Sequence, residues 1–271
     1  MLTYLAIIIR IFSNSYLNVF QKILSQKGQK SSVINFYTYL GLTLISVRFL
    51  CGIDYNNALL INTLIMGFLG ALGNYFIIKA LSIGELSVLA PINSYKPIVA
   101  LVLGMIFLNE YPRLISLFAI VLIIFGTLII TKNSDKTSVK AVFYRVMALV
   151  FSGTEAIFIK KVILLTNVSA GFALWCLSGF FFGLIFLIFS KNKPIIKSYK
   201  NQLFLIISVG VMQLTTNYVF SKMNVSYALA LFQLSTLISV FLGVNIFNED
   251  GFIRKLIGSV VMVTGAVILL L

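Results

Sequence analysis

Histidine is absent from this chain of 271 residues, and cysteine occurs only at Cys51 and Cys176. The lack of histidine excludes histidine-based acid–base catalysis and removes the commonest metal ligand. Both cysteines lie in apolar runs, so we expect neither a disulfide framework nor a metal site. The sequence therefore predicts no cofactor.

Charged residues are also scarce, at 10% of the chain, whereas 60% of the residues are hydrophobic and the mean hydropathy is +1.05. A soluble domain of this length would have more apolar surface than its core could bury. We therefore expect an all-α polytopic membrane protein that is embedded in a lipid bilayer. The 21 basic residues outnumber the 7 acidic ones, but they lie mostly in short gaps between apolar runs. That distribution is typical of topology-setting charge and predicts no nucleic-acid partner.

Ten apolar runs have about the length of 20 residues that a helix needs to cross a bilayer. The predicted transmembrane helices are residues 2–24, 33–51, 58–80, 86–108, 113–131, 141–163, 169–190, 202–222, 226–247 and 252–271. No gap between them is long enough for a soluble domain. One of the longest gaps, at residues 132–140, falls close to the middle of the chain.

An internal repeat divides the sequence at this midpoint. The segment LGMIFLNE, which ends at Glu110, matches LGVNIFNE, which ends at Glu249, and residues 15–24 lie over residues 154–163 at the same offset. The predicted domains are residues 1–135 and 136–271, with five helices each. Because five is odd, the second half lies upside down relative to the first, so we expect ten transmembrane helices as two inverted five-helix repeats. Such repeats are typical of secondary transporters, with the substrate site near the midplane between the halves.

The stretch ALSIGELSVLAPINSYKPIVALVLGMIFLNE, which ends at Glu110, and its weaker echo before Glu249 resemble the EamA-type family of the drug/metabolite transporter superfamily. The resemblance covers essentially the whole chain. It implies two five-helix repeats, a fourth helix that contains proline or glycine, and a glutamate in the turn that follows. It also implies a multi-pass protein of the cell inner (plasma) membrane, but it identifies no substrate. The second half departs from the pattern, because Thr236 lies over Pro97 and the ninth helix has no proline.

Lys96 is the sharpest candidate for a functional residue. It lies near the midpoint of the fourth predicted helix, where a lysine costs about 2.5–3.5 kcal/mol on insertion scales. On a helix it shares a face with Asn93. We expect this face to look into protein or water, where Lys96 contacts an anionic ligand. The alternative is a structural lysine that is permanently paired with a carboxylate.

Glu155 is the only carboxylate well inside a predicted span. A carboxylate balanced between burial and a nearby cation could bind protons during transport, which predicts a role in energy coupling. A static Lys96–Glu155 pair that locks two helices is equally compatible with the sequence.

A polar stripe runs along the first predicted helix at a spacing of three to four residues, and it favours a cavity lining because Arg10 needs water or an anion. Its members are Arg10, Asn14, Asn18 and Gln21. Asn74 in the third helix, and Gln213 with Asn217 in the eighth, are further candidates, for which helix packing is at least as compatible as substrate contact. Trp175 is expected among the residues that face lipid or its interface.

These residues together predict a secondary transporter that moves a small polar metabolite, zwitterionic or anionic, such as an amino acid, by alternating access. No nucleophile, base or metal cluster points to an enzyme. A multidrug or toxic-compound exporter of the same fold and a non-transporting membrane partner subunit are the alternatives. Gly258 and Gly265, seven residues apart in the tenth helix, indicate close packing, either between helices of the chain or in a homodimer.

The lysines concentrate in alternate loops, namely the first, the fifth and the seventh. The positive-inside rule places these loops in the cytoplasm and both termini outside. The resemblance implies the opposite orientation, with both termini inside.

Overall fold

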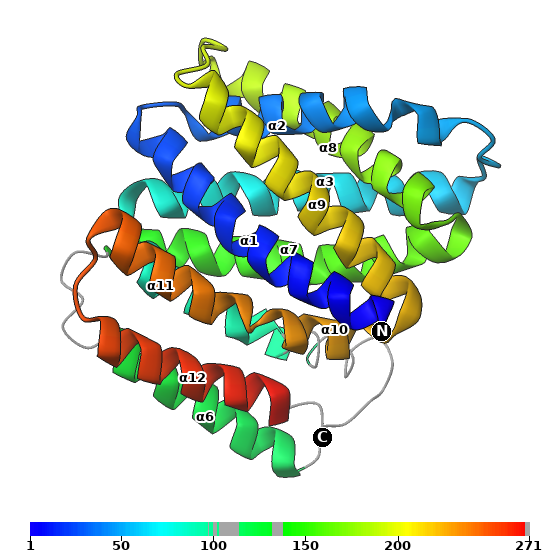
Figure 1. The fold of residues 1–271 in the computed structure, drawn as a ribbon. Helices are drawn as coiled ribbons and strands as arrows, with labels where there is room; N and C mark the ends of the chain where they lie inside the picture. Colours follow the sequence, from blue (N-terminus) through cyan, green and yellow to red (C-terminus); the bar gives the residue numbers. More distant parts are fainter. Residues whose placement is uncertain (97, 100–101, 103–113, 132–137, 269–271) are drawn as a thin grey trace.

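The computed structural model describes residues 1–96, 98–99, 102, 114–131 and 138–268, and these residues form helices joined by short connections (Figure 1). The described helices of the first half are α1 (Leu2–Gln26), α2 (Ser31–Ser46), η1 (Val47–Leu50), α3 (Asn57–Ile83), α4 (Leu86–Leu89), η2 (Pro91–Tyr95) and α6 (Leu114–Thr131). Those of the second half are α7 (Val139–Leu165), α8 (Val168–Ser190), α9 (Tyr199–Lys222), α10 (Val225–Phe232), α11 (Ser235–Phe247) and α12 (Phe252–Ile268). Both η elements are 3-10 helices.

Local sequence signals begin several of these helices. The side chains of Asn56 and Asn167 accept hydrogen bonds from the N–H groups three residues later, at 2.8 and 2.9 Å, and so cap α3 and α8. Six helical segments of the described chain are long and apolar enough to cross a membrane. A helix can do so because it satisfies its own backbone hydrogen bonds where no water is present.

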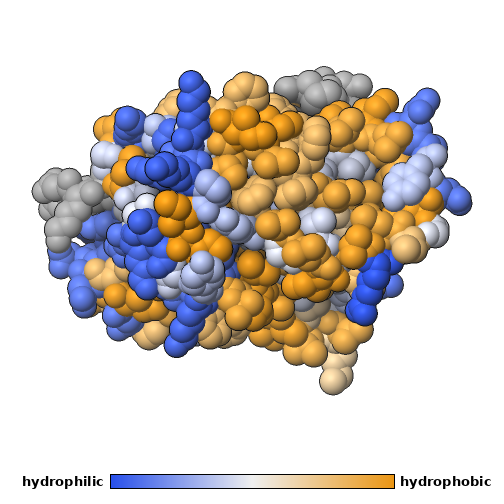
Figure 2. Space-filling view, turned by 90° about the horizontal axis from the view of Figure 1, so that it is seen from above, coloured by the Kyte–Doolittle hydropathy of each residue, from blue (hydrophilic) through white to orange (hydrophobic). Residues whose placement is uncertain are grey.

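The surface supports the same conclusion. Large apolar side chains such as Phe118, Leu128 and Phe181 are exposed. On the face shown in Figure 2, hydrophobic residues cover the middle of the molecule and hydrophilic residues gather toward its two ends. An apolar band of this extent would be a liability in water but matches the hydrocarbon of a bilayer. The prediction of an all-α, multi-pass membrane protein is confirmed.

Pairs of helices from the two halves pack against each other in a pattern that repeats. α1 packs on α9 and α3 packs on α7, while α2 packs on α8 and α6 on α12 (Figure 1). Since α7 is the repeat of α1 and α9 the repeat of α3, the first two interfaces correspond to each other. In the other two interfaces, α2–α8 and α6–α12, a helix packs against its own counterpart in the other repeat. A pseudo-two-fold axis in the membrane plane, as in inverted repeats, produces this set of contacts.

The two fourth helices of the repeats are interrupted, which differs from the predicted continuous helices at 86–108 and 226–247. In the first half α4 ends at Leu89, and Pro91 begins the 3-10 helix η2 because its ring offers no backbone donor. The rest of that prediction falls largely on residues outside the described ones. In the second half α10 ends at Phe232 and α11 begins at Ser235, so the helix is interrupted there without a proline.

Candidate substrate cavity

A cavity of about 120 Å³ lies between the two halves, walled by α1, α3, α7, α9 and the interrupted helices. This volume has room for several water molecules and therefore for a small polar solute. Eight of the predicted site residues line it: Arg10, Asn14, Asn18, Asn74, Asn93, Lys96, Glu155 and Gln213. Asn217 does not; it is fully buried, and its amide pairs with that of Gln213 at 2.9 Å. The geometry of Asn217 therefore corresponds to its helix-packing alternative.

Arg10 reaches the cavity from α1 and is buried. Its Nε donates a long hydrogen bond of 3.5 Å to Thr216 Oγ1, and its guanidinium carbon lies 4.0 Å from the ring centre of Phe232. Neither Arg10 Nη1 nor the acceptor Asn18 Oδ1, about two turns farther along α1, has a hydrogen-bond partner among the described residues. Buried polar groups are costly to leave unpaired, so both atoms are available to a solute.

Arg145 is a cavity residue that the sequence analysis missed. It lies on α7, where its Nε donates to the backbone oxygen of Leu89 at 2.8 Å and its Nη2 donates to Asn93 Oδ1 at 2.9 Å. An arginine this close to the beginning of a span ordinarily extends to the interface. Here the interruption between α4 and η2 exposes a free carbonyl, and Arg145 turns inward to bind it. No signal in the linear sequence indicates that contact.

Glu155 accepts a hydrogen bond of 2.5 Å from Trp175 Nε1. Trp175 is buried beside the cavity, so the prediction that it faces lipid is wrong. The approach of α3 to α7 at this point depends on Gly70, because a Cβ there would lie 2.3 Å from Glu155 Oε1. No Lys96–Glu155 ion pair is formed within the described part of the chain, so the static pair is not seen in this structure.

The charges of the cavity are unequal. Among the described residues that line it, Arg10, Lys96 and Arg145 are cationic and Glu155 alone carries a carboxylate. Arg10, Arg145 and Glu155 are buried and Lys96 is partly buried, so opposite charges attract strongly here and unmatched charges are costly. The arrangement favours an anionic group as the missing partner.

Comparison with known proteins now identifies the family. The profile of the EamA-like transporter family matches residues 1–132 and again residues 139–271. The chain belongs to the EamA-like transporter family. It is therefore a membrane transporter for a small-molecule substrate, and not an enzyme, with one EamA domain in each half. The predicted boundary between residues 135 and 136 falls between the two matches and stays a prediction.

A solved structure described as "Crystal structure of protein" has the same fold as this EamA-like transporter. Its TM-score is 0.67 at 12% sequence identity, over 98% of this chain and 95% of that chain. At this identity the likeness concerns the fold alone. No curated protein matches the chain.

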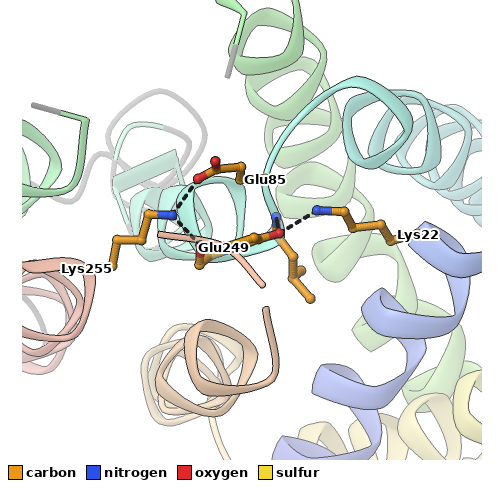
Figure 3. Close-up of polar contacts among 6 residues, drawn as sticks. Lys22, Glu85, Glu249 and Lys255 are labelled. Atoms are coloured by element: carbon orange, nitrogen blue, oxygen red, sulfur yellow. Dashed lines mark hydrogen bonds and ion pairs between the residues drawn. The ribbon is translucent and has the colours of Figure 1, made fainter. Parts of the chain in front are cut away.

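A second polar cluster of this transporter lies at the end of the bundle where α1 and α11 finish and α12 begins (Figure 1), and its charged residues are drawn in Figure 3. We call this end the charged end, and the opposite end, where Leu2 and Ile268 lie, the terminal end. At the charged end Lys22 forms an ion pair with Glu249, and Lys255 forms one with Glu85. We call these four residues the charge cluster.

Burial alone raises the pKa of Glu249, but the Lys22 ammonium and the hydrogen bonds from Lys22 and Ser87 bring this pKa below its ordinary value. Glu249 is thus an ionised partner in the charge cluster. Glu110, its counterpart in the repeat, lies outside the described residues.

Proposed function

We propose that this EamA-like transporter moves a small carboxylated metabolite, anionic or zwitterionic like an amino acid, by alternating access around the cavity. The observation that carries the proposal is the surplus of cationic side chains in a cavity between inverted repeats, three against one carboxylate among the described lining residues. A lipophilic cation would meet repulsion from the same set, which disfavours a multidrug exporter of cationic compounds.

Arg10 is the group that would bind the substrate carboxylate. Its Nη1 is unpaired, and a guanidinium can hold a carboxylate through two parallel hydrogen bonds. Lys96 supplies a second positive charge from the interrupted fourth span, while the amides of Asn14, Asn18 and Gln213 offer both donors and acceptors. Asn74 and Asn93 complete the polar wall, and Asn217 acts by orienting Gln213.

Glu155 would take one of two roles, according to the substrate. Its carboxylate can bind the ammonium group of a zwitterion, or it can bind and release a proton in each transport cycle. In either role the Glu155 carboxylate would act next to the indole of Trp175, which donates a hydrogen bond to it. Replacement of Glu155 by Gln removes either role while it keeps the shape of the side chain.

Trp175 gives a direct test of binding, because it is the only tryptophan of the chain and it lines the cavity. We would titrate the detergent-purified protein with a panel of amino acids and organic acids and follow the indole emission. A saturable change with a carboxylated compound is expected in the native protein and should be lost in Arg10→Gln and Lys96→Ala. Lys193→Ala, an exposed site at the charged end, is the matched control.

Transport is measured with the same compounds in proteoliposomes, with and without a pH gradient. Uptake that requires Lys96 and follows the gradient only when Glu155 is intact supports the substrate class and proton coupling together. Native uptake of the carboxylated compounds by both Arg10→Gln and Lys96→Ala would refute the proposed site. Selective movement of cationic compounds would instead favour the exporter.

A further inference from the structure

The two ion pairs of the charge cluster connect the halves of the transporter rather than neighbours within one half. Lys22 on α1 belongs to the first half and its partner Glu249 to the second, whereas Glu85 belongs to the first half and its partner Lys255 to the second (Figure 3). Four charges from four separate segments therefore meet where the two halves converge.

Ser87 links both pairs into one unit. The N–H groups of Leu86 and Ser87 donate to the two carboxylate oxygens of Glu249, at 2.7 and 2.8 Å, and the Ser87 hydroxyl donates to Glu249 as well. The same hydroxyl accepts a hydrogen bond of 2.8 Å from Lys255 Nζ. A movement that withdraws Glu249 from Ser87 therefore disturbs both ion pairs.

The charge cluster lies directly beyond one end of the cavity. Asn18 lines the cavity, and Lys22 follows it on α1 by about one helical turn, which is roughly 6 Å along the axis. On the other side, Arg145 lines the cavity and binds the backbone of Leu89, two residues after Ser87. The contacts among Lys22, Glu249 and Ser87 thus join α1 to the beginning of α4 across this end.

Burial makes such a contact suitable for repeated breaking. All four charged residues are at most 9% exposed. Buried ion pairs add little net stability, because the loss of hydration offsets much of the attraction. When the halves part and water enters, each charge regains its hydration. The contact is therefore specific when formed and not prohibitively costly to open.

Gly243 allows the second half to approach the charge cluster. A Cβ at this position of α11 would lie 2.7 Å from Glu249 Oε2 and 3.0 Å from the Ser87 backbone nitrogen. A side chain here would separate the groups that meet. Gly243 is the glycine of the segment LGVNIFNE that ends at Glu249. A glycine is needed at this position because α11 comes very close to the beginning of α4.

We propose that the charge cluster is a gate that closes the cavity toward the charged end, and that opening on that side requires both ion pairs to separate. The inference rests on the proposed alternating access, since a gate has meaning only where the two ends open in turn. It assigns Lys22, Glu85, Glu249 and Lys255 to the control of access and not to substrate binding.

The test measures access to the cavity without any substrate. A single reporter, Asn18→Cys, is placed in a background with Cys51→Ser and Cys176→Ala, and a membrane-impermeant maleimide is added to sealed vesicles from the charged-end side. Glu249→Gln, which is close in shape, should raise the labelling rate at position 18 several-fold. Lys193→Gln, an exposed charge at the same end, should leave it unchanged. An unchanged rate in Glu249→Gln would overturn the proposal.

These outcomes are independent of the proposed substrate. Failure of every carboxylated compound in the transport assay, combined with gate-dependent labelling, would refute the substrate class and leave the gate. Carboxylate transport combined with a labelling rate that does not change in Glu249→Gln would refute the gate and leave the substrate class.

Discussion

At the scale of single residues, Arg10 has the clearest mark of a ligand contact. Its Nη1 is buried without a hydrogen-bond partner among the described residues. Asn14 and Asn18, the next polar residues on the same face of α1, also line the cavity. A hydrogen bond between charged groups contributes about 1.5–3 kcal/mol, and each 1.4 kcal/mol is a factor of ten in affinity.

We expect Arg10→Gln to weaken carboxylate binding about tenfold or more, as read from the Trp175 emission. Arg10→Lys should show a smaller loss, since it keeps the charge without the planar fork. Equal affinities in all three proteins would contradict this role.

The charge cluster predicts how stability depends on pH. The pKa of Glu249 is below its ordinary value because Lys22 and Ser87 outweigh the effect of burial. The folded protein therefore binds fewer protons at this site than the unfolded chain. The stabilisation from Glu249 is present above the unfolded pKa and is lost as the pH falls through the folded pKa.

Thermal unfolding in detergent from pH 7 to pH 3 would measure this effect. The native protein should be more stable than Glu249→Gln near neutral pH, and the difference should shrink as the solution becomes acidic. The other charged groups that face Glu249 in the charge cluster are Lys255 and Glu85, and both are unchanged in Glu249→Gln. A difference that grows toward acidic pH would show that the direction assigned to the pKa shift is wrong.

At the scale of elements, close packing of α6 on α12 depends on glycines from both helices. A Cβ at Gly258 would lie 2.8 Å from the backbone oxygen of Gly126, and one at Gly126 would lie 2.7 Å from the backbone oxygen of Gly258. Gly265 makes an equivalent approach to the backbone oxygen of Ala119, at 2.8 Å. The predicted packing role of Gly258 and Gly265 is thus realised within the chain. The predicted homodimer is not shown and stays a prediction.

The α6–α12 contact predicts an unequal response to two similar substitutions. Gly258→Ala forces apart backbones that cannot yield locally, and overpacking of this kind costs about 1–3 kcal/mol. Gly183→Ala on α8 is the matched control, because its Cβ would meet only ordinary contacts at 3.6 Å or more. Alanine also favours a helix over glycine. The melting temperature should fall in the first variant and stay or rise in the second; similar melting temperatures would argue against the tight contact.

At the scale of the whole molecule, α1 begins and α12 ends at the terminal end, while the described connections α1–α2 and α8–α9, which carry Lys27, Lys30 and Lys193, lie at the charged end (Figure 1). A single labelling experiment therefore decides the orientation. The positive-inside rule places the charged end in the cytoplasm. We expect the exposed native Cys51, at the terminal end, to react with an impermeant maleimide from outside the cell. Lys193→Cys in a Cys51→Ser background should react only in inverted vesicles. The reverse pattern would show that the orientation implied by the family holds.

The sequence by itself determined the environment and the symmetry of this protein. Apolar runs of bilayer length are stable as transmembrane helices. The recurrence of LGMIFLNE as LGVNIFNE indicates an internal repeat, and five spans in each half make that repeat inverted. Lys96 and Glu155 were recognisable because an ionisable residue inside an apolar span is costly unless it faces a polar interior. The structure brings both to the cavity, although their roles in transport stay proposals.

Only the tertiary structure decided which polar groups meet. Arg145 and Trp175 look in the sequence like residues of the membrane interface, and they reach the cavity because an interrupted helix and Glu155 offer buried partners there. Glu249 looks like a turn residue until Lys22, 227 positions away, is found beside it. Hydropathy and helical spacing specify which face of a helix is polar. They carry no information on which distant face it meets, because that choice depends on the packing of all helices at once.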